Sequence, residues 1–193
     1  MNMERLGLFG GSFDPVHLGH LLVAQAAREE LSLTRMYFIP AAQSPFKPDR
    51  PPTPANERLR LLRLALSGKE WCEIDEQETQ RGGVSYTIET VRDYAKRFPK
   101  APLFYLIGAD HISELPKWRQ AEELAAAVEF VVIPRPGQKD VPFPKPFRGR
   151  MLTGFPLGVS SSQIRSRVRA GQPIDDLVPE AVSEAIRNNR LYL

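Results

Sequence analysis

The sequence predicts an α/β fold in which helices cover both faces of a doubly wound, mostly parallel sheet. Short apolar segments with strand character alternate along the chain with longer segments of helical periodicity. Such alternation requires crossover connections, which place the strands parallel and the helices on the faces of the sheet. The segment Leu103–Ile107 is apolar at every position, as expected of a central strand that is covered on both faces.

The individual elements follow from the same pattern. The expected strands are Arg5–Phe9, Met36–Pro40, Trp71–Ile74, Leu103–Ile107, Phe130–Ile133 and a less regular segment at Arg150–Leu152. The expected helices are His17–Leu31, Asn56–Ser67, Thr87–Phe98, Gln120–Ala127, Ser161–Ala170 and Pro179–Asn188. Two proline-rich segments, Pro40–Pro54 and Pro134–Pro146, are expected to be stiff surface loops, because proline fixes φ and lacks a backbone donor. Both begin directly after strands, where open α/β sheets bind ligands, so we expect the first of them to be functional.

Composition narrows the class of protein. With 193 residues, of which 42% are hydrophobic, the chain can bury one substantial core, so we expect a single domain over residues 1–193. Its C-terminal helical part, from about residue 158 to 193, is expected to pack on the rest. The net charge of +3 suits anionic substrates but is too small to indicate a nucleic acid as partner.

Cysteine content and hydropathy indicate the cellular compartment in which the protein is expected. A single cysteine, Cys72, offers no internal disulfide, and the sequence contains no Cys/His cluster that would indicate a zinc site. No apolar run approaches the roughly 20 residues that a membrane span needs, and no signal segment is recognisable. We therefore expect a soluble, cytoplasmic protein that does not use a membrane as partner. Whether it forms a homo-oligomer is not readable from the sequence.

Residues Gly10–His20, with the sequence GGSFDPVHLGH, carry the strongest functional signal. They form a predicted strand end, a glycine turn and a helix start, and a helix N-terminus presents unpaired N–H groups and a partial positive charge that suit phosphate. Adjacent glycines let the backbone approach a ligand closely. Asp14 and Pro15 are expected as the N-cap and first turn, and His17 and His20 on one helix face. The segment is expected to bind a polyphosphate.

Two common phosphate loops are excluded by the residues themselves. The segment lacks both the Gly-Lys-Ser/Thr ending of a P-loop and the three glycines of the dinucleotide fingerprint. It resembles instead the signature G-x-F-D-P-x-H-x-G-H of the nucleotidyltransferase superfamily, whose turn binds ATP. The matching positions are Gly11, Phe13, Asp14, Pro15, His17, Gly19 and His20. This resemblance implies a Rossmann-like form of the predicted fold.

A second cluster, GVSSSQIRSRVRAG, runs from Gly158 to Gly171. Its serines are expected to cap a helix that the final glycine closes. Arg165 near the helix start opposes the helix dipole, which indicates an anionic partner; the alternative is a capped, basic surface helix. Val159–Arg165 resembles the second superfamily signature, I-S-S-T/S-x-I/V-R, apart from valine at the first position.

Three features resemble the bacterial nicotinate mononucleotide adenylyltransferases within this superfamily. Ser85-Tyr86-Thr87 is similar to an S-Y-T motif that contacts the pyridine nucleotide, and Gly108, Asp110 and Trp118 are similar to a G-x-D…W element. Lys47 lies in a segment similar to a P-P-H-K substrate loop, although Phe46 replaces the histidine. Arg135 is similar to an arginine that lies near the nucleotide in this family. Each of these residues also has a structural alternative. Tyr86 and Thr87 could simply start a helix, Trp118 could anchor the core, and Arg135 could be an ordinary surface charge. Glu57 and Arg58 are expected on a helix surface.

The resemblance implies transfer of AMP from ATP to nicotinate mononucleotide, which gives nicotinate adenine dinucleotide and pyrophosphate. Because the substrate phosphate is already a nucleophile, the protein must supply placement and charge neutralisation rather than a base. The implied catalytic groups are His17, His20 and Arg165. The implied ATP contacts also include Gly10, Gly11, Ser12, Phe13, Gly108, Asp110, Ser160, Ser161 and Ser162, and the implied substrate contacts are Lys47, Ser85, Tyr86, Thr87, Trp118 and Arg135. Mg²⁺ is expected to arrive with the ATP phosphates, mostly through water, with no metal ligands from the protein.

Two alternative functions remain at this point. A phosphopantetheine adenylyltransferase would share the fold and the ATP site, although that family is shorter and usually carries threonine at the position of His17. A non-catalytic nucleotide-sensing module would use this fold without turnover, and the presence of both histidines and Arg165 argues against it.

Overall fold

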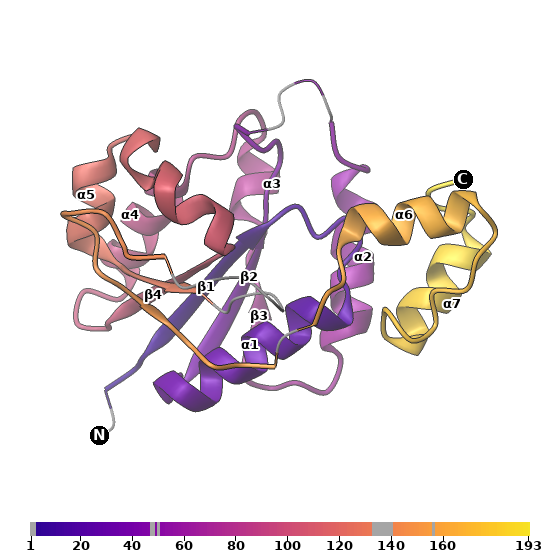
Figure 1. The fold of residues 1–193 in the computed structure, drawn as a ribbon, viewed down its shortest axis with the longest axis horizontal. Helices are drawn as coiled ribbons and strands as arrows, with labels where there is room; N and C mark the ends of the chain where they lie inside the picture. The colour runs from indigo at the N-terminus through magenta and orange to yellow at the C-terminus, as the bar shows by residue number, and fades with distance from the viewer. Residues whose placement is uncertain (1–2, 47–48, 50, 133–140, 156) are drawn as a thin grey trace.

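The computed structural model in Figure 1 describes residues 3–46, 49, 51–132, 141–155 and 157–193. Its centre is a six-stranded sheet in which every described strand pair is parallel. The strands are β1 (Leu6–Gly11), β2 (Arg35–Pro40), β3 (Cys72–Ile74), β4 (Leu103–Ile107), β5 (Glu129–Val132) and β6 (Gly149–Met151), in the spatial order β3-β2-β1-β4-β5-β6. In this order β2 and β3 extend the sheet on one side of β1, and β4, β5 and β6 extend it on the other side. This is the doubly wound arrangement, so the predicted α/β fold is confirmed.

Each predicted helix is present, and two short helical segments were not predicted. The helices are α1 (Leu18–Leu31), α2 (Ala55–Leu66), α3 (Gln77–Arg81), α4 (Thr87–Arg97), α5 (Ala121–Ala127), α6 (Ser161–Arg169) and α7 (Glu180–Asn188), with a 3₁₀ helix η1 at Ala109–Lys117. The unpredicted α3 consists of five polar residues, so it has no apolar repeat. In η1 the buried residues Ala109, Ile112 and Leu115 recur every three positions, which is the 3₁₀ period and lacks the i, i+4 positions that reveal an α-helix.

The two faces of the sheet carry separate apolar cores because side chains alternate along each strand. On one face, Met36 and Phe38 pack with residues of α1, α2, α6 and α7. On the other face, Tyr37 and Ile39 pack with residues of α4, η1 and α5. In Figure 1, α4 and α5 accordingly lie on the opposite side of the sheet from α2, α6 and α7.

The strand order places three loops at one edge of the sheet. β1 lies between β2 and β4, with Gly11 beside Pro40 and Phe9 beside Leu106. The loops that follow β1, β2 and β4 therefore leave the carboxyl edge next to one another, at the point where the winding reverses. Open α/β sheets bind their ligands in the crevice at this point.

The helices of the described ranges are short or carry many polar residues. None of them is both long enough and apolar enough to cross a bilayer.

Candidate active site

The turn after β1 is shaped by two glycines and one buried phenylalanine. A Cβ atom on Gly10 would lie 2.2 Å from the Tyr105 hydroxyl oxygen, so the close approach of β1 to β4 requires glycine here. Phe13 has φ 46°, and its ring is buried with its centroid 5.0 Å from that of the His20 ring. The Phe13 side chain therefore supports His20 from the core, and only its backbone faces the turn.

His17 and His20 are brought together by the cap of α1. His17 is the N-cap, and its backbone N–H donates to Nδ1 of His20 at 3.2 Å. The two imidazoles stack with centroids 3.6 Å apart and planes 26° apart. Because Nδ1 of His20 accepts this hydrogen bond, its neutral form carries the proton on Nε2, which makes Nε2–H a donor. The predicted juxtaposition of the two histidines is confirmed.

The prediction that Asp14 caps this helix is wrong. The helix begins three residues later than that prediction requires. Reciprocal side-chain contacts of His17 and His20 cap its start, and the Leu18 N–H donates to the Leu177 carbonyl at 3.0 Å. The Asp14 carboxylate points to a different segment, where Oδ2 accepts the Thr53 backbone N–H at 3.1 Å. Asp14 therefore links the turn to the end of the first proline-rich segment.

The start of α6 docks on the same turn. Ser160 is its N-cap and accepts the Gln163 N–H at 3.3 Å, as the sequence predicts. The Ser161 hydroxyl donates to the Pro15 carbonyl at 2.8 Å, and Nη1 of Arg165 donates to the Asp14 carbonyl at 2.5 Å. Nη2 of Arg165 also lies 3.4 Å from the Ser162 hydroxyl. Two motifs about 150 residues apart thus form one surface.

Gly19 allows this close docking. A Cβ atom at Gly19 would lie 2.9 Å from Cγ1 of Val159 and 3.0 Å from Nδ1 of His17. Contacts this short are not tolerated by a real side chain, so the glycine of the first motif is needed where the second motif packs against it. The two signatures are thus coupled by packing.

The predicted pyridine-nucleotide segment is joined to the loop after β2. Ser85 is buried: its hydroxyl accepts the Ala42 N–H at 2.9 Å, and its own N–H donates to the Gln43 carbonyl at 2.9 Å. Thr87 begins α4, and its hydroxyl lies 3.4 Å from the Tyr105 hydroxyl, the group next to Gly10. The segment is therefore held at the same sheet edge as the glycine turn.

An aromatic group flanks this segment. Trp118 is half-buried and packs edge-on against Tyr105 and Phe130, with centroids 6.5 and 6.0 Å away. Phe46 and His111 lie on its other side, at 5.7 and 5.9 Å. Trp118 thus anchors the core and also contributes to a cluster of rings at the loops. Tyr86, the N-cap of α4, lies under the Arg119 guanidinium at 4.5 Å.

Asp110 lies in η1, two residues after Gly108, which directly follows β4. Its side chain is 71% exposed, and its Oδ2 lies 4.0 Å from Nε2 of His111. A largely exposed carboxyl group at the switch point is available to a ligand. Two other predicted substrate residues, Lys47 and Arg135, lie outside the described residues.

The prediction that Arg58 lies on a helix surface is wrong. Arg58 is 1% exposed; its Nε donates to the Thr53 carbonyl and its Nη1 to the Ser12 carbonyl, both at 2.8 Å. Burial lowers the pKa of this guanidinium, and the nearby Asp14 carboxylate opposes that shift. The burial of Arg58 could have been inferred from its spacing in the sequence. It stands three residues before Leu61 and four before Leu62, which places it on the apolar face of α2.

Glu78 is a second buried charged residue that the sequence did not reveal. It lies in α3 behind the pyridine-nucleotide segment, is 4% exposed, and accepts a hydrogen bond from the Thr90 hydroxyl at 2.5 Å. Burial raises the pKa of its carboxyl group, while hydrogen bonds from Thr90 and Ser85 oppose the rise. No apolar periodicity marks so short a helix, so its buried side could not be identified from the sequence.

Glu78→Gln is expected to stabilise the protein at neutral pH. Because the folded-state pKa of Glu78 is raised above the ordinary value of 4.5, the wild type is favoured at lower pH and loses stability as pH rises through the raised pKa. Glutamine keeps an acceptor for Thr90 without a charge. The melting temperature of the variant minus that of the wild type should be greater at pH 7 than at pH 4. An equal difference at the two pH values would contradict the assignment.

The described residues offer no cage for a metal ion. Within them, no group of three or more histidine, cysteine, aspartate or glutamate side chains converges closely enough to hold one.

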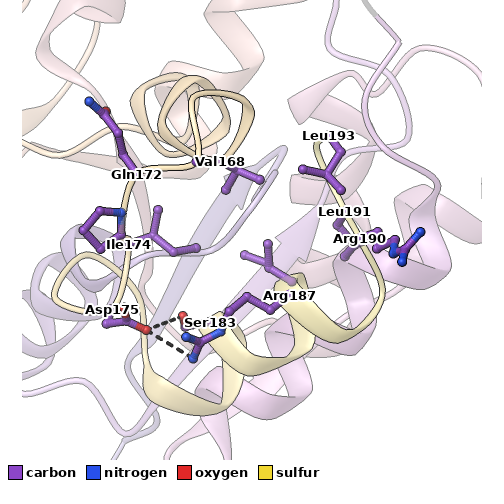
Figure 2. Close-up of a pocket in the computed structure, with 12 residues that line it drawn as sticks. Val168, Gln172, Ile174, Asp175, Ser183, Arg187, Arg190, Leu191 and Leu193 are labelled. Atoms are coloured by element: carbon purple, nitrogen blue, oxygen red, sulfur yellow. Dashed lines mark hydrogen bonds and ion pairs between the residues drawn. The ribbon is translucent and has the colours of Figure 1, made fainter.

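A cavity of about 410 Å³ lies elsewhere, between α6, α7 and the C-terminal residues (Figure 2). Its walls are largely apolar, with Ile174 and Leu191 among them, and at its edge Asp175 accepts a hydrogen bond from Ser183 at 2.7 Å and pairs with Arg187 at 3.3 Å. Val168 and Gly171, at the end of the second cluster, are among its lining residues, but none of the lining residues belongs to the glycine turn or to Val159–Arg165. The candidate site is therefore the surface at the carboxyl edge of the sheet.

Sequence comparison agrees with this geometry. The family model described as cytidylyltransferase-like matches residues 8–167. A protein from Opitutus terrae named "Probable nicotinate-nucleotide adenylyltransferase" is 38% identical, with 97% of each chain covered. A protein of the same name from Gemmatimonas aurantiaca is 41% identical, with 97% of this chain and 92% of that protein covered.

Solved structures share the fold. A nicotinic acid mononucleotide adenylyltransferase of Plasmodium falciparum, complexed with NaAD, aligns with a TM-score of 0.79 at 17% identity, covering 98% of this chain and 97% of that one. A structure from Vibrio parahaemolyticus aligns with a TM-score of 0.72 at 19% identity, covering 98% and 96%. Together with the sequence relatives, these findings show that the chain belongs to the cytidylyltransferase-like family and, within it, to the nicotinate-nucleotide adenylyltransferases.

Proposed function

We propose that this chain transfers the AMP group of ATP to the 5′-phosphate of nicotinate mononucleotide, giving nicotinate adenine dinucleotide and pyrophosphate for NAD biosynthesis. The observation that carries the proposal is the docking of α6 on the turn before α1, where Arg165 and Ser161 contact Asp14 and Pro15. The stacked imidazoles of His17 and His20, the N-terminus of α6 and one guanidinium group thereby meet at the switch point of the sheet. This combination suits a triphosphate.

In the proposed reaction a phosphate oxygen of nicotinate mononucleotide attacks the α-phosphorus of ATP. The bond from that phosphorus to the bridging oxygen of the β-phosphate breaks, and pyrophosphate leaves with the electron pair. The protein places the two phosphates in line and neutralises the charge that grows on the leaving group. No proton has to be removed from the attacking phosphate.

On the ATP side, His17 and His20 contact the triphosphate, with His17 nearest the α-phosphate. Backbone N–H groups of Gly11 to Phe13, which follow β1, hold phosphate oxygens, as do the serines of the α6 start. Arg165, already at the turn, binds the β- and γ-phosphates with the fork of its guanidinium group.

On the substrate side, Thr87 and nearby N–H groups meet the carboxylate of the pyridine, and Trp118 stacks on its ring. Ser85 and Tyr86 have a supporting position, since Ser85 bonds the loop after β2 and Tyr86 caps α4. Lys47 and Arg135 remain predicted substrate contacts. Gly108 gives the backbone of its loop close access to the nucleotide.

Mg²⁺ accompanies ATP and adds positive charge at the phosphates. When bound, it would be held together with the ATP phosphates and would help to neutralise the charge that grows on pyrophosphate. Asp110, an exposed carboxylate at this edge, is the residue that fits a water-mediated contact.

We also propose that residues 1–193 form a single nucleotidyltransferase domain of a cytoplasmic enzyme. The C-terminal helical part, about 158–193, shares one apolar core with α1 and α2 through residues such as Ile164 and Val182. Shared burial of this kind favours one folding unit.

The test is a parallel assay of the purified protein with ATP and Mg²⁺. Nicotinate mononucleotide, nicotinamide mononucleotide and phosphopantetheine are supplied separately, and dinucleotide and pyrophosphate are measured. We expect turnover to be fastest with nicotinate mononucleotide. Turnover only with phosphopantetheine would replace the substrate assignment, and ATP binding without turnover on any of them would favour a nucleotide sensor.

A further inference from the structure

We infer that Arg58 is a positioning residue of the ATP site, which fixes the direction of the Phe13 backbone N–H from beneath the turn. The inference rests on the proposed function, because it assigns a role within the phosphate-binding turn. Arg58 belongs to neither motif and lies about 45 residues further along the chain than the turn it contacts.

The contacts of Arg58 are those of a brace between two loops. Its Nη1 donates to the Ser12 carbonyl in the glycine turn, and its Nε donates to the Thr53 carbonyl just before α2, both at 2.8 Å. A third bond runs between the same two loops, from the Thr53 N–H to the Asp14 carboxylate at 3.1 Å. The turn and the proline-rich segment are thereby joined through buried polar groups.

Because the peptide bond is planar, the hydrogen bond from Arg58 to the Ser12 carbonyl also sets the direction of the Phe13 N–H. The Ser12 carbonyl and the Phe13 N–H belong to one trans peptide unit, in which the C=O and N–H vectors point opposite ways. Arg58 holds the carbonyl toward the buried side of the turn. The Phe13 N–H is therefore turned toward the outer side, where the proposed phosphates bind.

Arg165 contacts a second carbonyl group of the same turn, that of Asp14. Its Nη1 donates to the Asp14 carbonyl at 2.5 Å. The peptide unit of that carbonyl ends at Pro15, which has no N–H, so Arg165 orients no donor through it. The two arginines thus have separate roles: Arg58 acts through the backbone, and Arg165 is the one at the outer surface.

The chemistry of burial supports this reading. A buried guanidinium group is expensive, and a packed apolar side chain in its place is often at least as stabilising. Arg58 is 1% exposed, in a helix whose other inward side chains are apolar, such as Leu61 and Leu62. A charged, forked donor at this position is explained by the two carbonyl groups that it must hold at once.

The test compares three variants by ATP binding. Arg58→Met keeps the length and apolar stem of the side chain but removes its donors; Arg58→Lys keeps the charge but cannot donate in two directions from a planar fork. Leu62→Ala, on the same buried face of α2, is the matched control, because it removes apolar packing from the helix and no hydrogen bond to the turn. The dissociation constant for MgATP is measured by calorimetry at a temperature where each variant is folded, and the Phe13 amide is followed by ¹⁵N NMR.

We expect Arg58→Met to weaken ATP binding by about tenfold and to shift the Phe13 amide resonance, with Arg58→Lys intermediate. The KM for nicotinate mononucleotide should change little, and Leu62→Ala should lower the melting temperature without weakening ATP binding. Unchanged ATP affinity in Arg58→Met, or an equal loss of affinity in Leu62→Ala, would overturn the inference. If Arg58→Met does not fold, the lysine variant decides: wild-type affinity and an unshifted Phe13 amide would overturn it.

The same experiment separates this inference from the proposed function. ATP affinity is measured without the second substrate, so it reports on the turn whatever the acceptor is. A wild-type protein that binds ATP but does not use nicotinate mononucleotide would contradict the proposed substrate, while the comparison of affinities would still decide the role of Arg58.

Discussion

Replacing His20 with alanine is expected to lower kcat by about 10²–10³-fold, the usual cost of removing one positioned donor from a developing charge. His20 presents Nε2 from the first turn of α1, while its Nδ1 accepts the His17 N–H. The expected cost in stability is smaller, about 1 kcal/mol for the lost cap. Steady-state turnover and the melting temperature measure the two effects.

His20→Asn separates catalysis from capping. The asparagine side-chain oxygen lies near the position of Nδ1 and can accept the His17 N–H, but nothing replaces Nε2. We expect the asparagine variant to melt close to the wild type and to lose turnover as severely as the alanine variant. Near-normal turnover in either variant would show that His20 is not a catalytic group.

The second large effect is expected from Arg165. Arg165→Ala should lower kcat/KM by about 10²–10³-fold, because the group that we propose binds the β- and γ-phosphates is lost together with its bond to the Asp14 carbonyl. Arg165→Lys should recover only a small part of the activity, since an ammonium group cannot form the same fork. Initial rates over a range of ATP concentrations give the comparison.

Arg169→Ala is the matched control. Arg169 lies on the same helix one turn later and is exposed, so its loss removes the same charge without touching the glycine turn. We expect it to retain wild-type kcat/KM. A comparable loss in both variants would mean that the overall positive charge of α6 matters, and that Arg165 has no specific contact with the phosphates.

Local chemistry explains why much of this site could be predicted. The glycine turn, the stacked histidines and the Ser160 cap depend on residues within about ten positions of each other, so their spacing in the sequence carries their geometry. The parallel sheet follows from the alternation of apolar strands and amphipathic helices. The wrong prediction that Asp14 caps α1 shows the limit of such local inference, because the actual cap is formed by His17 together with His20.

The sequence by itself thus determined the fold class, the order of elements and the two motifs that mark the family. Only the tertiary structure decided which buried charges support the site. From the sequence alone, Arg58 and Glu78 are expected at the surface, because a charged side chain is ordinarily solvated. Their burial depends on partners 46 and 12 residues away, the Ser12 carbonyl and the Thr90 hydroxyl, and such pairings exist only after the sheet and its helices have packed.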